Sequence, residues 1–266
     1  MEKERTIKLK IKLIGVLAAI ILLTEPVGYY GQLQAAENDN EDLAFRITAL
    51  FRAYRKCSAS NKNSIHKTQE FFKSPEKVSA MFHKQAQIHY KLMTKTCYPK
   101  DEDTQFGKVS KSLEAAVDQV FKKVAEGTYD LKWTGENEYI KKWDGKLLPA
   151  RFASLIAEQF NKDTKGINIK LTTSDKLLIN KKNAPDAWEL KIIGENMLNT
   201  SQKTGKPVYE QVGKQFRYLL PEYYAPACIQ CHGTGSGQEG FEIHPSKFPA
   251  KVGSFAGAIS VIIETE

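Results

Sequence analysis

Residues 207–220 have the sequence Pro-Val-Tyr-Glu-Gln-Val-Gly-Lys-Gln-Phe-Arg-Tyr-Leu-Leu. Two strand-like segments, 207–212 and 215–220, stand on either side of Gly213 and Lys214. So short a connection joins antiparallel strands, because parallel neighbours need a crossover of roughly a dozen residues or more. We therefore predict that an antiparallel sheet is the framework of the second half of the chain.

The first half of the chain has a helical pattern. Apolar residues recur at steps of three and four, which indicates helices over 38–72, 75–96 and 104–126. Further on, the apolar spacing predicts helices over 149–161 and 185–199, and strands over 167–171, 177–180 and 254–264. The predicted fold class is α+β, with an antiparallel sheet preceded by long N-terminal helices.

Cys228-Ile229-Gln230-Cys231-His232 is a C-x-x-C-H motif, the attachment signature of c-type haem. In such motifs the two thiols add to the haem vinyl groups as thioethers. The histidine beside the second thiol then becomes the proximal iron ligand. Because the chain has one such motif, we predict one haem c, bound covalently through Cys228 and Cys231 and ligated by His232.

Two other interpretations of this motif, a zinc site and a redox dithiol, are less well supported. A zinc site would normally need a second C-x-x-C or a histidine pair, whereas Cys57 and Cys97 stand alone in the sequence. A thioredoxin-like dithiol sits at the start of a helix in a βαβ unit. Here the motif follows Pro226 and precedes a glycine-rich run over 233–237, so haem attachment is the favoured interpretation.

The N-terminus has the pattern of an export signal. Residues 1–12 carry five basic side chains, and an apolar run over 13–23 follows, too short for a comfortable membrane span. The residues before Ala35-Ala36 make a poor cleavage site, so 1–36 is either a signal peptide or an uncleaved N-terminal anchor. Both predict export to the periplasm or an equivalent compartment, where c-type haem is installed.

Composition limits the possible partners. The chain has 266 residues and a formal net charge of +8, with its lysines dispersed. Dispersed lysines indicate a solvated basic surface, or alternatively a docking face for an acidic redox partner or an anionic membrane. There is no basic patch interleaved with aromatic residues and no helix-turn-helix signal, which argues against nucleic-acid binding.

Several segments resemble an exported single-haem c-type family with a PAS-like fold. The segments are 144–149 (DGKLLP), 183–189 (NAPDAWE), 218–221 (YLLP), 228–233 (CIQCHG) and 253–261 (GSFAGAISV). Ser254 and Ala256 depart from the charged residues usual in the last segment, which puts any ion pair there in doubt. The resemblance implies a PAS-like haem-binding domain over 128–266, after a helical region over 37–127.

The identity of the sixth iron ligand stays open. Cys57 lies on the apolar stripe of the first predicted helix, and the resemblance implies that a cysteine of this helix can be the distal ligand. His89 is the runner-up. The alternatives for Cys57 are a disulfide with Cys97, since the compartment is predicted to be oxidising, and an ordinary buried thiol.

Three functions remain, in this order. The first is a module that senses redox state or a small gas of the NO or CO kind and signals through a partner or through homo-oligomerisation. The second is a periplasmic electron carrier. The third is a haem enzyme, which we do not favour because no distal His-Arg pair or second haem is evident in the sequence.

Overall fold

The structure, a computed structural model, describes residues 39–61, 65, 71–98, 103–128, 140–143, 149–198, 205–232, 241–243 and 250–265. Residues 35–266 form one compact unit. The predicted leader over 1–36 lies outside the described residues. Among the helices that are described, none is long and apolar enough to cross a membrane.

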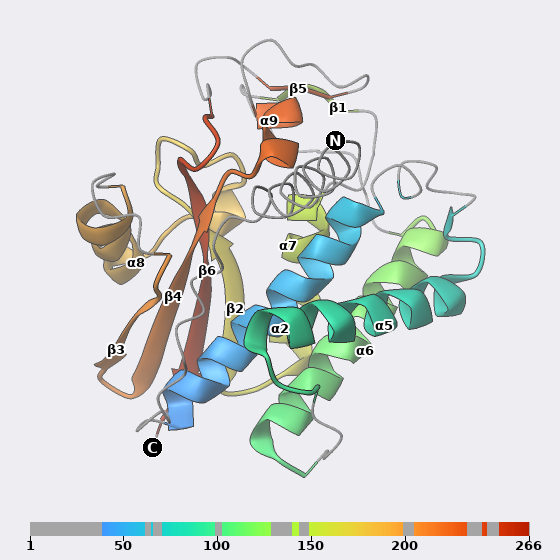
Figure 1. Cartoon of the computed structure of the whole chain (residues 1–266), viewed down its shortest axis with the longest axis horizontal. Coiled ribbons are helices and arrows are strands. Elements are labelled where there is room, and N and C mark those ends of the chain that lie inside the picture. Colours follow the sequence, from blue (N-terminus) through green and yellow to red (C-terminus); the bar gives the residue numbers. More distant parts are fainter. Residues whose placement is uncertain are drawn as a thin grey trace, which may run out of the picture. The chain divides into compact units, whose positions relative to one another are not determined.

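The main sheet has four antiparallel strands in the spatial order β2-β6-β4-β3 (Figure 1). Their bounds are Ile167–Thr172 for β2, Val208–Val212 for β3, Gln215–Tyr223 for β4 and Phe255–Glu264 for β6. The tight β3–β4 connection turns at Gly213, whose φ of 59° suits glycine. The antiparallel α+β arrangement predicted from the sequence is therefore confirmed.

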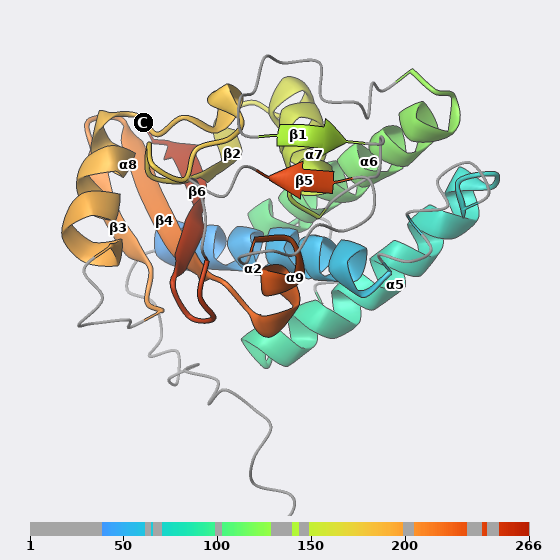
Figure 2. The same ribbon diagram turned by 90° about the horizontal axis from the view of Figure 1, so that it is seen from above.

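The helices on one face of the sheet form two layers (Figures 1 and 2). α2 (Asp39–Ser60) contacts β4 and β6, and α7 (Pro149–Asp163) contacts β2. α5 (Pro75–Thr94) and α6 (Gln105–Ala125) pack outside them. One buried core joins these four helices to the three longer strands, so the N-terminal helices and the sheet are packed as one body.

A smaller element covers the opposite face. α8 (Ala187–Ile192) continues as a π-helical turn, η2 (Ile193–Met197), and these pack on a second apolar cluster around Leu219 and Ala258. Beside the main sheet, the short strands β1 (Ile140–Trp143) and β5 (Phe241–Ile243) pair antiparallel, as Figure 2 shows.

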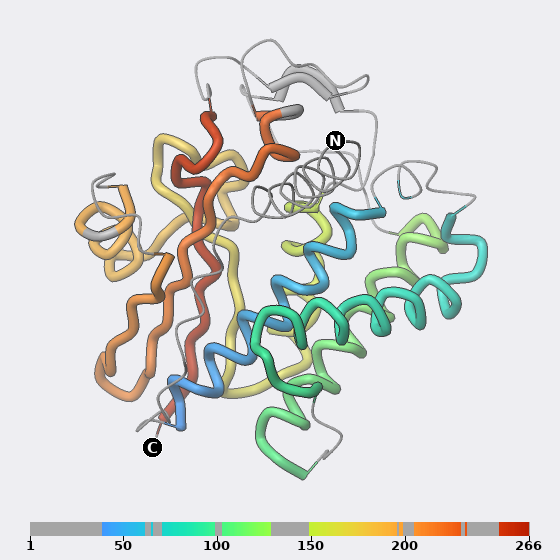
Figure 3. The backbone as a smooth tube through the Cα atoms, in the orientation of Figure 1, coloured from blue at the N-terminus to red at the C-terminus, as the bar shows by residue number. Residues whose placement is uncertain are grey.

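Alternation along β4 decides which residues meet the helices. Phe216, Tyr218 and Leu220 belong to the core under α2, whereas Leu219 belongs to the cluster under α8. Glu222 continues the even-numbered series and so faces α2 near the end of the strand. This strand end, traced by the tube in Figure 3, leads directly into α9 (Pro226–His232).

Most predicted elements are confirmed within a few residues, but three expectations need correction. The strand expected over 177–180 is wrong: a turn at 174–177 leads instead to a 3₁₀ helix, η1 (Lys181–Asn183). Asn180 caps that helix by accepting from the N–H of Lys182, chemistry that favours a turn over a strand. The first helix stops at Ser60, not at 72, and the motif, which lies outside every predicted helix, forms α9.

Candidate functional site

The C-x-x-C-H motif forms the short helix α9 at the end of β4. Positions 228, 231 and 232 stand at i, i+3 and i+4, the spacing that places residues on one face of a helix. The helix opens with a hydrogen bond from the N–H of Cys228 to the carbonyl of Ala225, 2.9 Å. The thiol of Cys228 is free and half-buried.

Backbone hydrogen bonds tie both ends of α9 to the segment that enters β6. The N–H of Tyr224 donates to Ser254 O at 3.0 Å, and the N–H of Gly253 donates to Tyr224 O at 2.7 Å. At the far end, the N–H of Ala250 donates to His232 O at 3.0 Å. Two strands of the sheet therefore fix the position of the motif helix.

His232 is held against Tyr224, with ring centroids 5.2 Å apart. Burial, and to a lesser degree the positive charge of Arg55, lowers the pKa of His232 to about 4. The imidazole is therefore neutral at neutral pH, the form that binds a metal ion. A neutral imidazole four positions after a free thiol on the same helix fits a donor set for a thioether-linked metalloporphyrin.

Three charged residues lie beside this helix. Arg52 Nε is 2.5 Å from Glu222 Oε1, and Arg55 Nη1 is 2.8 Å from Glu222 Oε2. Arg52 also donates to the carbonyl of Pro221 at 3.3 Å. Burial would raise the pKa of Glu222, but the charges and hydrogen bonds of Arg52 and Arg55 hold it below its usual value. The carboxylate therefore stays ionised and clamps both guanidinium groups.

The sequence did not predict this charged cluster. Arg52 and Arg55 have the i, i+3 spacing that places two side chains on one helix face, and that spacing was the available signal. Nothing local indicates that this face meets Glu222, about 170 positions later, because only the crossing of α2 over β4 brings them together.

Cys57 lies elsewhere on α2. Its thiol is fully buried and points to the carbonyl of Phe82 on α5, with Sγ and O 3.8 Å apart. Burial raises the pKa of this thiol to about 12. Two positions along a helix correspond to a rotation of about 200°, so Cys57 faces away from the side on which Arg55 meets Glu222.

Cys57 and Cys97 are both free, one buried and the other exposed, and thus form no disulfide.

His89, the second candidate ligand, is half-buried on α5. No described residue makes a hydrogen bond to its buried Nδ1. Burial, with a smaller effect from Lys56, lowers the pKa of His89. The structure therefore groups His232 with Tyr224 and Arg55, and it places Cys57 and His89 in or beside the contact of α2 with α5.

The 183–189 segment fastens α8 to the sheet. Asp186 and Glu189 form a capping box, each side chain accepting from the other's backbone N–H at 2.9 Å. Arg217 of β4 pairs with Asp186, and Lys170 of β2 lies 2.7 Å from Glu189 Oε2. Trp188 stacks under the Arg217 guanidinium. These contacts give the segment a structural role.

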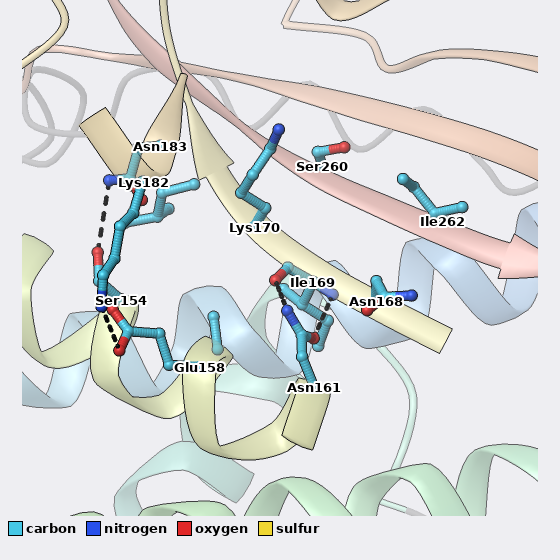
Figure 4. A pocket seen from close by; sticks show the side chains of 12 residues that line it. Ser154, Glu158, Asn161, Asn168, Ile169, Lys170, Lys182, Asn183, Ser260 and Ile262 are labelled. Carbon is cyan, nitrogen blue, oxygen red and sulfur yellow. Dashed lines mark hydrogen bonds and ion pairs between the residues drawn. The ribbon is translucent and has the colours of Figure 1, made fainter. Parts of the chain in front are cut away.

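A cavity of about 290 Å³ lies between α7, β2 and η1 (Figure 4). Asn161 lines it and pairs with both backbone groups of Ile169, at 2.8 Å each. Lys182 and Glu158 form an ion pair at 3.3 Å across its rim. No residue of α9 lines the cavity, so it is separate from the motif.

The sequence model of one known family, the Tll0287-like family, matches residues 34–264. The chain belongs to the Tll0287-like family. The structure of this chain is similar to the solved structure of the cyanobacterial heme-protein Tll0287, with 14% sequence identity and a TM-score of 0.37. The similarity covers 61% of this chain and 96% of Tll0287. Because the similarity is low, we assign no residue of this chain a role from that protein. No curated protein matches the chain.

Proposed function

We propose that this chain is an exported haem c protein with one covalent haem, attached at Cys228 and Cys231 and ligated by His232. The observation that carries the proposal is a C-x-x-C-H motif on a short helix whose histidine is neutral and fixed by the sheet. Membership of the Tll0287-like family supports it, because Tll0287 itself is a cyanobacterial heme-protein.

The chain's own residues would perform three tasks. The thiols of Cys228 and Cys231 would hold the porphyrin covalently, His232 would offer its neutral nitrogen to the iron, and Tyr224 would limit the rotation of the His232 ring. When bound, the haem supplies an iron that exchanges one electron or binds a diatomic gas. We propose redox or NO-type gas sensing as the role, with signalling to a partner protein.

Cys57 is our proposed distal ligand, with His89 as the runner-up. A thiol ligates iron as the thiolate, and the raised pKa of Cys57 keeps it protonated where it now contacts Phe82 O. Ligation by Cys57 would therefore require α2 to turn or α5 to move, together with loss of the thiol proton. Such a change at the iron is the kind of two-state event that a sensor needs.

Electron transfer is the alternative function, and the net charge of +8 favours it. A basic carrier would dock on acidic redox partners, and the rate of electron transfer would fall as salt screens the attraction. A gas sensor would show no such dependence in its ligand-binding spectrum.

The deciding experiment is expression of the full chain in a host competent in cytochrome c maturation, followed by intact mass and optical spectra. We expect one added haem, and none in a Cys228→Ser, Cys231→Ser variant. Wild-type protein without added porphyrin mass would overturn the proposal.

The optical spectra separate the two roles. A spectral change on addition of NO or CO supports gas sensing, and a reducible haem that binds neither gas supports electron transfer. Cys57→Ala and His89→Ala then test the distal ligand through the ferric Soret band.

A further inference from the structure

The cluster of Arg52, Arg55 and Glu222 has more positive than negative charge. Two guanidinium groups, which remain protonated in proteins, face one carboxylate. The side chains are 26%, 25% and 15% exposed, respectively, so solvent only partly screens the surplus charge. These three side chains together therefore hold one net positive charge in a fixed position.

That position is beside the motif helix. Glu222 stands two residues before Tyr224 on the same extended segment, and the Tyr224 ring contacts the ring of His232. Tyr224 is also hydrogen-bonded to Gly253 and Ser254, which fixes the turn between β4 and α9. Figures 1 and 2 both show α9 following the end of β4, and Arg52 and Arg55 of α2 reach that strand end through Glu222.

The double contact to Glu222 holds this charge in place. An exposed arginine would move its guanidinium by several ångströms among rotamers, whereas Glu222 binds one arginine at each oxygen and Pro221 O accepts from Arg52 as well. A charge that does not reorganise has a larger effect on a neighbouring site than a mobile one.

We propose that Arg52 and Arg55, clamped by Glu222, are positioning residues that stabilise the reduced form of the haem held at His232. This inference rests on the proposed function. Reduction takes up one electron and lowers the charge of the iron centre by one, so a fixed positive charge nearby favours the product. An external one-electron donor supplies the electron.

The test is the reduction potential of the haem-loaded full chain, measured by optical titration with a reductant and mediators. Arg55→Gln should lower the equilibrium constant for reduction about tenfold, or about 59 mV for a one-electron couple. Glu222→Gln removes the negative charge and should shift the potential in the opposite direction. Arg55→Lys keeps the charge and should stay close to wild type.

Arg46→Gln is the matched control, because Arg46 is on the same helix but pairs with Asp42 on the preceding turn. It removes the same charge away from Glu222 and should leave the potential unchanged. Equal potentials for Arg55→Gln, Glu222→Gln and Arg46→Gln would overturn the inference. Absence of haem from the wild-type chain would instead overturn the proposed function. If Arg55→Gln fails to fold, Glu222→Gln and Arg55→Lys still decide the outcome.

Discussion

The guanidinium of Arg217 lies over the indole ring of Trp188, 4.9 Å from its centroid. The same guanidinium pairs with Asp186 and comes within 4.0 Å of Glu189, a carboxylate whose side chain is fully buried. Arg217 is itself 8% exposed. One arginine on β4 therefore neutralises the start of α8 and covers its tryptophan, which fixes the helix on the sheet.

Replacing Arg217 with Met should destabilise the protein by about 3 kcal/mol, because, among the described residues, it leaves Lys170 as the remaining cation near Asp186 and Glu189. Urea unfolding followed by circular dichroism measures the loss. Lys182→Met is the control, since its 70% exposed side chain forms a surface pair with Glu158 that contributes under about 1 kcal/mol. Equal losses in the two variants would contradict a buried role for Arg217.

Strand β2 is an edge of the sheet, and Asn161 protects it. The amide of Asn161 accepts from the N–H of Ile169 and donates to its C=O, so it replaces a missing neighbouring strand at that residue. Asn161→Ala should cost about 1–2 kcal/mol, because two backbone groups lose their hydrogen bonds.

Hydrogen exchange at the Ile169 amide tests this directly, and we expect faster exchange in Asn161→Ala. Asn168→Ala is the control, because Asn168 is exposed on the same strand. If the Ile169 amide exchanged at the same rate in both variants, the edge would not depend on Asn161.

The sequence predicts those parts of the fold that depend on local chemistry. The helix of Pro75–Thr94, the strand of Ile167–Thr172 and the capping box of Asp186 and Glu189 follow from apolar spacing and from residues three positions apart. The failure over 177–180 has a local cause too, because an Asn cap outweighs a short apolar run.

The surroundings of His232 depend on long-range packing. The histidine was identified from its motif, but the environment that keeps it neutral comes from burial and from Arg55, which reaches the site because α2 crosses the end of β4. Cys57 was correctly expected to face the core. Its orientation toward α5 depends on the angle between two helices, and apolar periodicity does not encode that angle.

Gly257 occupies a position in β6 that other residues fit poorly. Its φ is 150°, and a Cβ added there would lie 2.7 Å from the carbonyl oxygen of Thr172 on the neighbouring strand. Gly257→Ala should therefore destabilise the protein by about 2 kcal/mol or more, through backbone strain and a clash with rigid main chain. Thermal unfolding measures the effect. Gly194→Ala is the control, because open space surrounds Gly194 in η2, and it should be neutral or stabilising.

The two cysteines outside the motif should differ sharply in reactivity. Cys97 is exposed, whereas Cys57 is buried and its pKa is raised to about 12, so almost no thiolate forms there. Under native conditions a maleimide should modify Cys97 within minutes and Cys57 only after denaturation. Peptide mass mapping assigns the sites, and Cys97→Ser should abolish the fast reaction. A mass increase of two hydrogens on treatment with reductant would reveal a disulfide and contradict the free thiols.

Acid should weaken the attachment of α8 through Asp186. Burial would raise the pKa of Asp186, but hydrogen bonds from Arg217 and from the N–H of Glu189, with the charges of Arg217 and Lys170, hold it below its usual value. A carboxyl whose pKa is lower in the folded than in the unfolded state stabilises the fold above the unfolded pKa of about 3.9. That stabilisation is lost as the pH falls through the folded pKa.

Asp186→Asn isolates this charge, because Asn retains the ability to cap α8. The free energy of unfolding should fall less between pH 6 and pH 3 in the variant than in wild type. The difference should stay below about 1 kcal/mol, because the Asp186 side chain is 41% exposed and solvent screens the pair. Urea unfolding at the two pH values provides the comparison, with Asp39→Asn at the exposed start of α2 as the control. An acid loss in Asp186→Asn as large as in wild type would show that other carboxylates set the acid limit of the fold.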